Sequence, residues 1–340
     1  MGVTQADVAR RAGVSQRTVS NVVNKFPYVS ADVVARVNEA IAELGYAPSQ
    51  AARSLRSGRS RVIQLVVPEL DVPYFSELAR GVVRAAEDRG FGVMVRQTLG
   101  DPRREQEALE GSAADYAEGT ILSAVGPIES LVGGGRARPP VVLIGERSGQ
   151  GLADHIGIDD VAAAAAATTH LLESGRRRVS FIGADPVNSL RMAEMRMRGY
   201  QRALEAAGSR IEEELIVRTR SYHRADGASG MALLLDAVNP PDAVFCATDL
   251  LALGALHEAR VRGVRVPEDV AVIGFDGLEE GAYSAPTLST IAPDKRAIAA
   301  GAVSLLLARI EARNSAEGEP EPQDHVIPFD VVVRESSRGR

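Results

Sequence analysis

Apolar residues recur at helical spacing in the first 45 positions. Three stretches show this pattern, at residues 5–12, 16–24 and 31–44, and each gathers its small and branched apolar residues on one face. Gly13 separates the first two stretches by a tight turn, and Gly45 ends the third. The pattern predicts three short helices. The first two form a helix-turn-helix that leaves the N-terminal end of the second helix free to enter a major groove.

From residue 62 onwards, apolar runs alternate with helical segments. The run VIQLVVPEL at 62–70 is continuously apolar and rich in β-branched residues, which is typical of a strand buried on both faces. Further strands are predicted at FGVMVRQT, GTILSA, PVVLIG, RVSFIGA, DAVFCA and VAVIGF, and helices at 74–90, 102–114, 161–174, 191–207, 225–237 and 249–262. Strands separated by helices predict parallel sheets with helices on both faces, and the two series predict two similar α/β halves.

The composition fits a soluble protein of two or three domains. With 340 residues, the chain exceeds what one hydrophobic core usually organises, and its 45% hydrophobic and 25% charged residues are ordinary for globular proteins. No apolar run approaches the length of a membrane span, and the start lacks the apolar core of a secretory signal, so the cytoplasm is the expected location. The single cysteine, Cys246, excludes an intrachain disulfide and is expected in the buried core.

Basic residues are concentrated at the start of an otherwise acidic chain. Residues 1–60 hold eight Lys and Arg against four Asp and Glu, whereas the whole chain has a net charge of -6, so the start suits a polyanion. On the predicted second helix, the Gln16 amide matches an adenine edge and the Arg17 fork matches guanine. The expected phosphate contacts are Ser15, Thr18, Ser20 and Asn24. The alternative is a small helical packing domain whose polar residues are only solvated.

A short basic segment, YAPSQAARSLRSGRSR at 46–61, joins the helices to the first strand. Leu55 stands alone as a large apolar residue among Arg53, Arg56 and Arg59, which is the composition of a minor-groove wedge with phosphate contacts. The same content of Ser, Gly and Arg also fits a plain linker.

Polar and aromatic residues follow the predicted strands of the two α/β halves. Open α/β sheets bind ligands beyond the carboxyl ends of their strands, so these residues are candidate ligand contacts. They are the carboxylates Asp71, Asp159, Asp185, Asp249 and Asp276, the aromatic residues Tyr74, Phe75 and Tyr222, and Arg196 early in a helix. Carboxylates, an arginine and aromatic faces together favour a sugar site. Each aspartate alone is also a usual helix cap.

Catalytic motifs are absent from the sequence. There is no Walker phosphate loop, HExxH, GxSxG or dinucleotide-binding GxGxxG, and the five histidines are scattered. We therefore expect a binding protein without a metal or cofactor. The alternatives are the solute-binding protein of a sugar transporter, against which the basic start argues, and an enzyme that acts on a sugar in the same cleft.

Several motifs in a fixed order resemble the LacI/GalR family of bacterial transcriptional regulators over essentially the full length. They are DVARRAGVSQRTVSNVVN, AELGYAPSQAARSLRSGRS, VVLIGER, RRRVSFIG, MRGYQRAL, ATDLLALGAL, VPEDVAVIGFDG and PTLSTI. The resemblance implies an α/β core of two doubly wound parallel-sheet subdomains, like periplasmic sugar-binding proteins, with an N-terminal all-α helix-turn-helix headpiece. The implied division is headpiece 1–46, hinge helix and linker 47–60, first subdomain 61–159 and 288–320, and second subdomain 160–287 and 321–340.

The resemblance also implies a sequence-specific regulator, expected to be a repressor, that binds a pseudo-palindromic operator as a homodimer. A small molecule bound between the subdomains, with a sugar as the expected class, would control operator affinity. The implied DNA contacts add Thr4 and Tyr46 at phosphates and Ala52, Leu55 and Arg56 at the minor groove. The implied effector contacts are Asp71, Tyr74, Phe75, Asp159, Arg196, Tyr222, Asp249 and Asp276. Three residues depart from the family pattern, since Asn21 replaces an Arg, Thr248 an Asn and Gly277 a second Asp.

Overall fold

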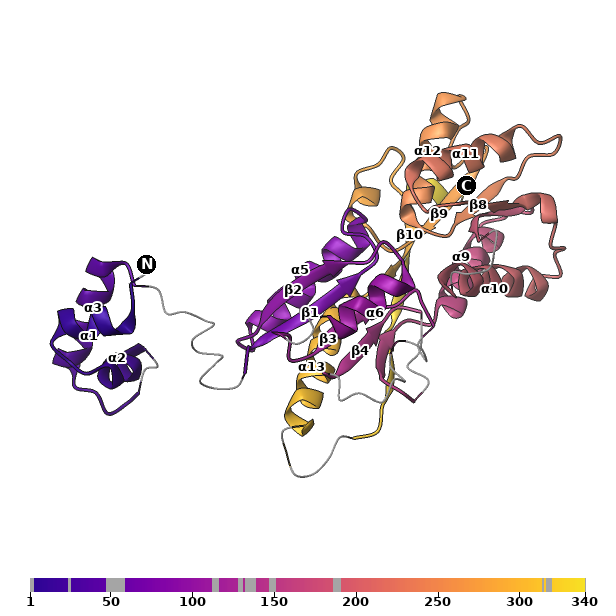
Figure 1. The fold of residues 1–340 in the computed structure, drawn as a ribbon. Helices are drawn as coiled ribbons and strands as arrows, with labels where there is room; N and C mark the ends of the chain where they lie inside the picture. The colour runs from indigo at the N-terminus through magenta and orange to yellow at the C-terminus, as the bar shows by residue number, and fades with distance from the viewer. Residues whose placement is uncertain are drawn as a thin grey trace. The chain divides into compact units, whose positions relative to one another are not determined.

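The computed structural model describes residues 3–23, 26–46, 59–111, 116–127, 131, 139–146, 151–185, 191–313, 315 and 320–339. By its internal contacts the chain divides into two compact units, Met1–Arg61 and Val62–Arg340, which we call the headpiece unit and the core unit (Figure 1). Among the described residues, no helix combines the length and the apolar character that crossing a membrane requires.

The headpiece unit contains the three predicted helices, α1 (Gln5–Ala12), α2 (Gln16–Val23) and α3 (Ala31–Leu44). Their apolar faces form one small core in which Val8, Val19 and Val37 are fully buried. The turn between α1 and α2 depends on Gly13, whose φ of 66° lies in the left-handed region that glycine adopts without a steric penalty. The apolar periodicity therefore predicted this unit correctly.

The core unit contains two six-stranded sheets. The first has the strand order β11-β5-β4-β3-β1-β2 and the second β12-β10-β9-β8-β6-β7. The strands of the first sheet are β1 (Val62–Val67), β2 (Gly92–Gln97), β3 (Thr120–Ser123), β4 (Val141–Ile144), β5 (Asp154–Gly157) and β11 (Asp324–Val326). Those of the second are β6 (Val179–Ala184), β7 (Ile216–Arg218), β8 (Ala243–Cys246), β9 (Ala271–Phe275), β10 (Ser289–Pro293) and β12 (Phe329–Val332). All neighbouring strands are parallel except β10 and β12.

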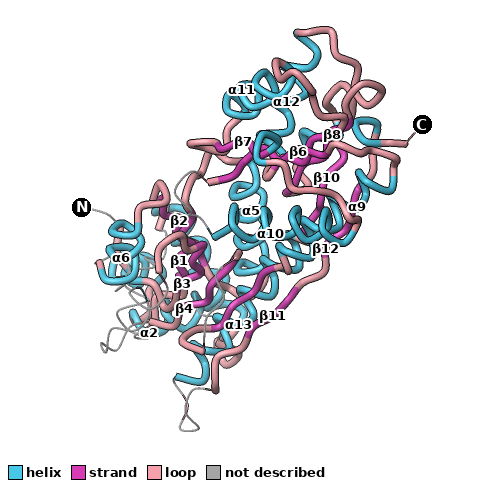
Figure 2. Tube along the Cα trace, turned by 90° about the vertical axis from the view of Figure 1, so that its right-hand side faces the viewer, coloured by secondary structure: helices cyan, strands magenta, loops and turns pink. Residues whose placement is uncertain are grey.

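Helices cover both sheets, as Figure 2 shows for the two lobes of the core unit. The first sheet carries α5 (Pro73–Glu87), α6 (Pro102–Glu110) and α13 (Lys295–Arg313), and the second carries α9 (Asp160–Glu173), α10 (Arg191–Ala206), α11 (Arg224–Leu235) and α12 (Asp249–Val261). A short 3-10 helix, η2 (Glu279–Ala282), lies between β9 and β10. Each sheet has its own large apolar core. Cys246 is fully buried in the second, as predicted.

The chain passes between the two sheets three times. The first passage runs from β5 to α9. The other two differ from the predicted boundaries at 288 and 320, because β10 pairs with β9 in the second sheet and β11 pairs with β5 in the first. The return to the first sheet therefore follows Pro293, and the last passage separates β11 from β12. The residues of β10 are buried like those of the central strands in either sheet, so their hydrophobic pattern alone does not say which sheet they join.

Two glycines allow α11 and α12 to pack backbone against backbone. A Cβ atom at Gly227 would lie 2.0 Å from the Leu251 carbonyl oxygen, and one at Gly254 would lie 1.9 Å from the Arg224 carbonyl oxygen. We expect Gly227→Ala to lower the free energy of unfolding by about 1 to 3 kcal/mol, because the two helices must move apart to admit the methyl group. Urea denaturation measures this change, with Ser229→Ala on the exposed side of α11 as the control. Equal midpoints for the two variants would contradict the expectation.

Candidate functional site

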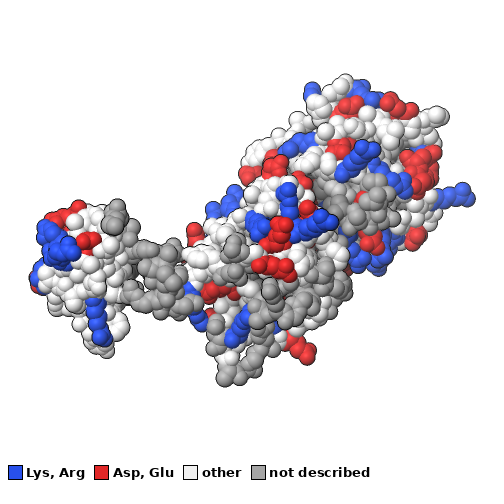
Figure 3. Space-filling model, in the orientation of Figure 1, with Lys and Arg blue, Asp and Glu red and all other residues white. Residues whose placement is uncertain are grey.

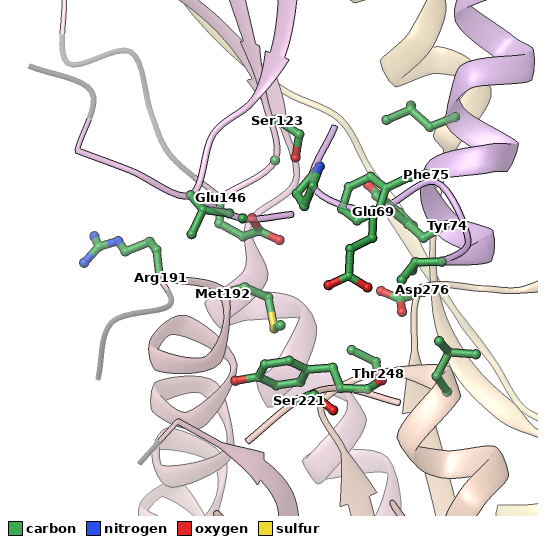
Figure 4. A pocket seen from close by; sticks show the side chains of 18 of the residues that line it. Glu69, Tyr74, Phe75, Ser123, Glu146, Arg191, Met192, Ser221, Thr248 and Asp276 are labelled. Atoms are coloured by element: carbon green, nitrogen blue, oxygen red, sulfur yellow. The ribbon is translucent and has the colours of Figure 1, made fainter. Parts of the chain in front are cut away.

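A cavity of about 330 Å³ lies beyond the carboxyl ends of both sheets of the core unit (Figure 4). Its lining comes from the segments after β1, β2, β3 and β4 of the first sheet and after β7, β8 and β9 of the second, together with the N-terminal turns of α5 and α10. This is the place where the direction of parallel strands predicts a ligand site. The volume is at the small end of the range for small-molecule sites.

Five of the eight predicted effector contacts line this cavity. They are Tyr74, Phe75, Arg196, Tyr222 and Asp276. Asp71, Asp159 and Asp249 do not line it. Asp159 instead caps α9, with its carboxylate accepting a hydrogen bond of 2.9 Å from the Ala162 N–H.

Asp249 lies inside the second subdomain, where it is fully buried. Its carboxylate accepts hydrogen bonds of 2.7 Å from the Thr290 hydroxyl and of 2.7 Å from the Leu278 N–H. It therefore joins α12 to β10 and to the turn after β9. The neighbouring Thr248, which caps α12 through the Leu251 N–H, lines the cavity instead.

Arg196 is the centre of the polar wall of the cavity and is 6% exposed. Its Nε donates to Asp160 at 2.9 Å, its Nη1 donates to the Ala247 carbonyl at 2.6 Å and to Asp276 at 3.4 Å, and its Nη2 donates to Glu146 at 3.4 Å. The guanidinium carbon also lies 3.6 Å from the centre of the Phe275 ring. Glu146 follows β4 of the first sheet, so this contact joins the two subdomains.

Three acidic residues near the cavity were missed by the sequence analysis. Asp160, the partner of Arg196, is one residue beyond the predicted Asp159, and only the exact start of α9 decides which of the two faces inward. Glu69 and Glu146 follow β1 and β4, which is where ligand residues of parallel sheets lie. The sequence analysis missed them because it considered only aspartates, aromatic residues and one arginine at these positions. Ser123, Met192 and Ser221 also line the cavity.

Burial and like charges raise the pKa values of two of these carboxyls. Burial raises the pKa of Asp160 to about 7, the carboxylates of Glu146 and Asp276 add to the increase, and Arg196 opposes it. Burial likewise raises the pKa of Asp276 to about 6, with Arg196 and Lys295 opposing and Glu146 adding to the shift. The two carboxyls therefore hold protons over a range of pH in which isolated carboxyls have already lost them.

The raised pKa of Asp160 predicts a pH dependence of stability. The folded protein holds this proton more tightly than the unfolded chain does. Protonated Asp160 therefore adds to the unfolding free energy at low pH, and this addition is lost as the pH rises from about 4 to about 7. We expect Asp160→Asn to flatten the fall in unfolding free energy over this window, measured by urea denaturation at several pH values. A fall as steep as that of the unsubstituted protein would contradict the assignment of this proton to Asp160.

A histidine–carboxylate contact and an ion pair lie where the two subdomains meet. His223 Nε2 lies 3.3 Å from the Glu69 carboxylate, and Lys295 Nζ lies 2.8 Å from the Glu77 carboxylate. Lys295 also donates to the carbonyl oxygens of Asp276 and Gly277, at 2.6 and 2.8 Å. These bonds hold Asp276 at a φ of 120°, a strained value for a residue with a side chain, and residues with such strain cluster at ligand sites.

Aromatic rings line the cavity from both subdomains. Tyr74 and Phe75 begin α5 and meet edge to face with their ring centres 5.3 Å apart, while Tyr222 follows β7 of the second sheet. Burial raises the pKa of Tyr74 and of Tyr222 above the ordinary value, so both hydroxyls stay protonated. The Tyr222 hydroxyl is buried and has no hydrogen-bond partner in the described part of the chain.

In the headpiece unit, Gln16 and Arg17 are exposed on the first turn of α2. Ser15 precedes them and accepts a hydrogen bond of 3.1 Å from the Thr18 N–H, as a helix cap does. Thr4 plays the same part for α1 in a capping box with Asp7. Ser20 and Tyr46 are half-buried. The predicted contacts Asn24, Ala52, Leu55 and Arg56 lie outside the described residues.

Comparisons with known proteins match both units. Residues 4–49 match the bacterial regulatory proteins of the lacI family, and residues 168–337 match the periplasmic binding protein-like domain. The HTH-type transcriptional repressor CytR of Escherichia coli (strain K12) is 31% identical over 337 residues, which cover 99% of this chain and 96% of CytR.

Two solved structures are similar as well. A putative transcriptional regulator of the LacI family from Sanguibacter keddieii is 41% identical with a TM-score of 0.76, and the match covers 83% of this chain and 100% of that one. The complex of the transcriptional regulator CelR with cellobiose is 29% identical with a TM-score of 0.71, and the match covers 98% of this chain and 99% of that one.

Proposed function

Because the chain belongs to the LacI family of bacterial regulatory proteins, we propose that it is a repressor that binds a pseudo-palindromic operator as a homodimer. It is a DNA-binding transcription regulator under the control of a small molecule, and its family consists of regulators rather than enzymes. One observation supports this function best. A single chain combines an exposed helix-turn-helix with a cavity at the carboxyl ends of two parallel sheets. The solute-binding protein of a transporter does not need a helix-turn-helix.

The proposed operator contacts start from α2. Gln16 and Arg17 are exposed at its N-terminal end, where recognition helices meet base edges. The proposed phosphate contacts are Thr4, Ser15, Thr18, Ser20, Asn24 and Tyr46. The positions of Thr4 and Ser15 at the N-termini of α1 and α2 support this role, because helix N-termini attract phosphate.

Replacing Arg17 by alanine is expected to weaken operator binding at one base position per half-site by about 1 to 3 kcal/mol. The loss follows from removing a two-pronged contact with guanine, so operators already changed at that position should bind equally well with and without the substitution. Fluorescence anisotropy with a set of single-base operator variants at fixed salt measures this. A uniform loss across all operators would instead assign Arg17 to a phosphate.

The proposed effector is a sugar held by Tyr74, Phe75, Arg196, Tyr222 and Asp276. Aromatic faces that stack on C–H groups, together with carboxylates that accept from hydroxyls, support this class. The structural relative CelR was solved with cellobiose. Asp159 and Asp249 are assigned to helix capping and to the turn after β9, and Asp71 is not assigned to the site.

The proposed mechanism couples the cavity to the operator. Contacts between the subdomains, such as Glu146 with Arg196 and Glu69 with His223, change when a ligand enters between them. A ligand that binds one arrangement of the subdomains better than the other shifts the population toward it. The hinge segment 47–60, with Ala52, Leu55 and Arg56 at the minor groove, carries that shift to the DNA in this proposal. The cytoplasm is the proposed location.

Thermal-shift screening against sugars, sugar phosphates and nucleobases tests this function. A ligand that binds only the folded protein must raise the melting temperature. The proposal expects that a compound found in this way changes operator affinity. A protein that retards no DNA at low salt, while it still binds a sugar, would revive the solute-binding alternative. A new product formed from a sugar during incubation would favour an enzyme.

A further inference from the structure

Around Arg196, the wall of the effector cavity carries more negative than positive charge. Arg196 faces three carboxylates, those of Asp160, Asp276 and Glu146. A second cation close to Asp276, the half-buried Lys295, is already paired with Glu77 and donates to two backbone carbonyls. The visible surface of the core unit, in contrast, mixes acidic and basic side chains (Figure 3). The excess of negative charge is confined to the carboxylates that surround Arg196.

Arg196 is not available as a fork for an anion. Each of its three nitrogens already donates to an oxygen of the protein, and the flat face of the guanidinium rests on the Phe275 ring. A phosphate or carboxylate at this place would have to displace Glu146 and would still lie beside Asp160 and Asp276. Like charges at such short range in a buried site disfavour binding strongly.

Two other arginines line the cavity but do not change this balance. Arg191 pairs with Glu194 at 3.0 Å, has 44% of its side chain exposed and points away from the centre of the cavity (Figure 4). Arg220 is exposed. Water and salt screen exposed charges, so these two residues affect a buried ligand less than Asp276 does, whose side chain is 10% exposed.

Carboxylates reach the cavity from both subdomains. Glu69 follows β1 of the first sheet and Asp276 follows β9 of the second, and both side chains point into the space between them (Figure 4). The faces of aromatic rings attract cations as well, and Tyr74, Phe75 and Tyr222 line the same space. Aromatic rings combined with carboxylates are the side chains that recognise an ammonium group.

We propose that the effector is a cation, a ring compound with a protonated amine, such as an amino sugar, held between the carboxylates of Glu69 and Asp276. This inference rests on the proposed function, because it names the chemical class of the ligand in the same cavity. The amine supplies the positive charge that the wall lacks, and the ring packs against the aromatic side chains. The contact between Glu69 and His223 occupies part of this place. Phosphorylated and carboxylated rings are excluded by the same charges.

Pairs of ligands that share a ring but differ in charge separate the effect of charge on affinity from that of shape. Glucosamine, galactosamine and mannosamine each have an N-acetyl counterpart that keeps the ring and loses the charge, and glucuronate supplies an anionic ring. Calorimetry with the full-length protein at low salt should give an affinity for one of the amines at least about tenfold higher than for its N-acetyl counterpart, since a hydrogen bond to a charged group contributes about 1.5 to 3 kcal/mol. Glucuronate should not bind measurably.

The substitution Glu69→Gln tests the residue. It keeps the shape of the side chain and removes its charge, so it should reduce the preference for the amine by about tenfold and leave the affinity for the N-acetyl compound nearly unchanged. Glu205→Gln on the exposed end of α10 is the matched control and should change neither affinity. An unchanged preference in Glu69→Gln would overturn the assignment of Glu69.

The failure of this inference is distinguishable from the failure of the proposed function. If a neutral or anionic ring binds most tightly and alters operator affinity, the proposed ligand class is wrong, but the proposed function as a ligand-controlled regulator is supported. If no amine of the panel binds at millimolar concentration, the ligand class is also overturned. If the amine binds as expected and operator affinity does not change, the cation site stands and the proposed control of DNA binding fails.

Discussion

Arg196→Met is expected to lower the unfolding free energy of the core unit by about 3 to 5 kcal/mol and to abolish the response to the effector. Removing one partner of a buried ion pair leaves the other without compensation. Here the substitution removes the cation that is paired with the side-chain carboxylates of Asp160, Asp276 and Glu146. Methionine retains the length of the side chain and its packing against Phe275, so the loss measures charge rather than volume.

Urea denaturation of the full-length protein measures this effect, followed by calorimetry with the effector. The control is Arg198→Met, two residues along the same helix, where the side chain is 60% exposed and pairs with Glu194. Because protonated carboxyls need no cation, the loss in Arg196→Met should shrink as the pH falls below the raised pKa values of about 7 and 6. Equal stability of the two variants at neutral pH would refute the central role of Arg196.

Leu55→Ala is expected to weaken operator binding by about 2 to 4 kcal/mol, while the protein remains folded and dimeric. In this proposal Leu55 enters the minor groove as a wedge, and the contacts made on the bent DNA offset the cost of unstacking the bases. Alanine is too short to separate a base step, so the bend and the contacts that depend on it are lost together.

Anisotropy titrations at fixed salt measure the loss, with Ser57→Ala in the same segment as the control. Binding to random DNA should change little, because that binding rests on the phosphates. Operator affinity that is the same with leucine and alanine would remove the wedge from the mechanism.

The sequence was sufficient to predict most of the fold. Strands such as VIQLVV are buried on both faces and carry no polar alternation, and the helices between them keep a 3.6-residue period. The headpiece is predicted for the same reason, since Val8, Val19 and Val37 are spaced to meet in one core. The spacing of apolar residues within each helix or strand determines that element, so this spacing is enough to predict it.

Long-range partners account for what the sequence did not predict. The pairing of β10 with β9 and of β11 with β5 depends on which sheet offers an open edge, which no local pattern states. Asp159 and Asp160 are both plausible ligands until the start of α9 turns one outward as a cap and the other toward Arg196. Glu146 is important only because Arg196, fifty residues further along the chain, reaches it across the cavity.

Operator affinity measured with and without the effector, and effector affinity measured with and without the operator, test the central claim most directly. If the cavity controls the headpiece, the effector changes operator affinity by about 5- to 150-fold, and the operator changes effector affinity by the same factor. An effector whose binding requires Arg196 but leaves operator affinity unchanged would contradict the account.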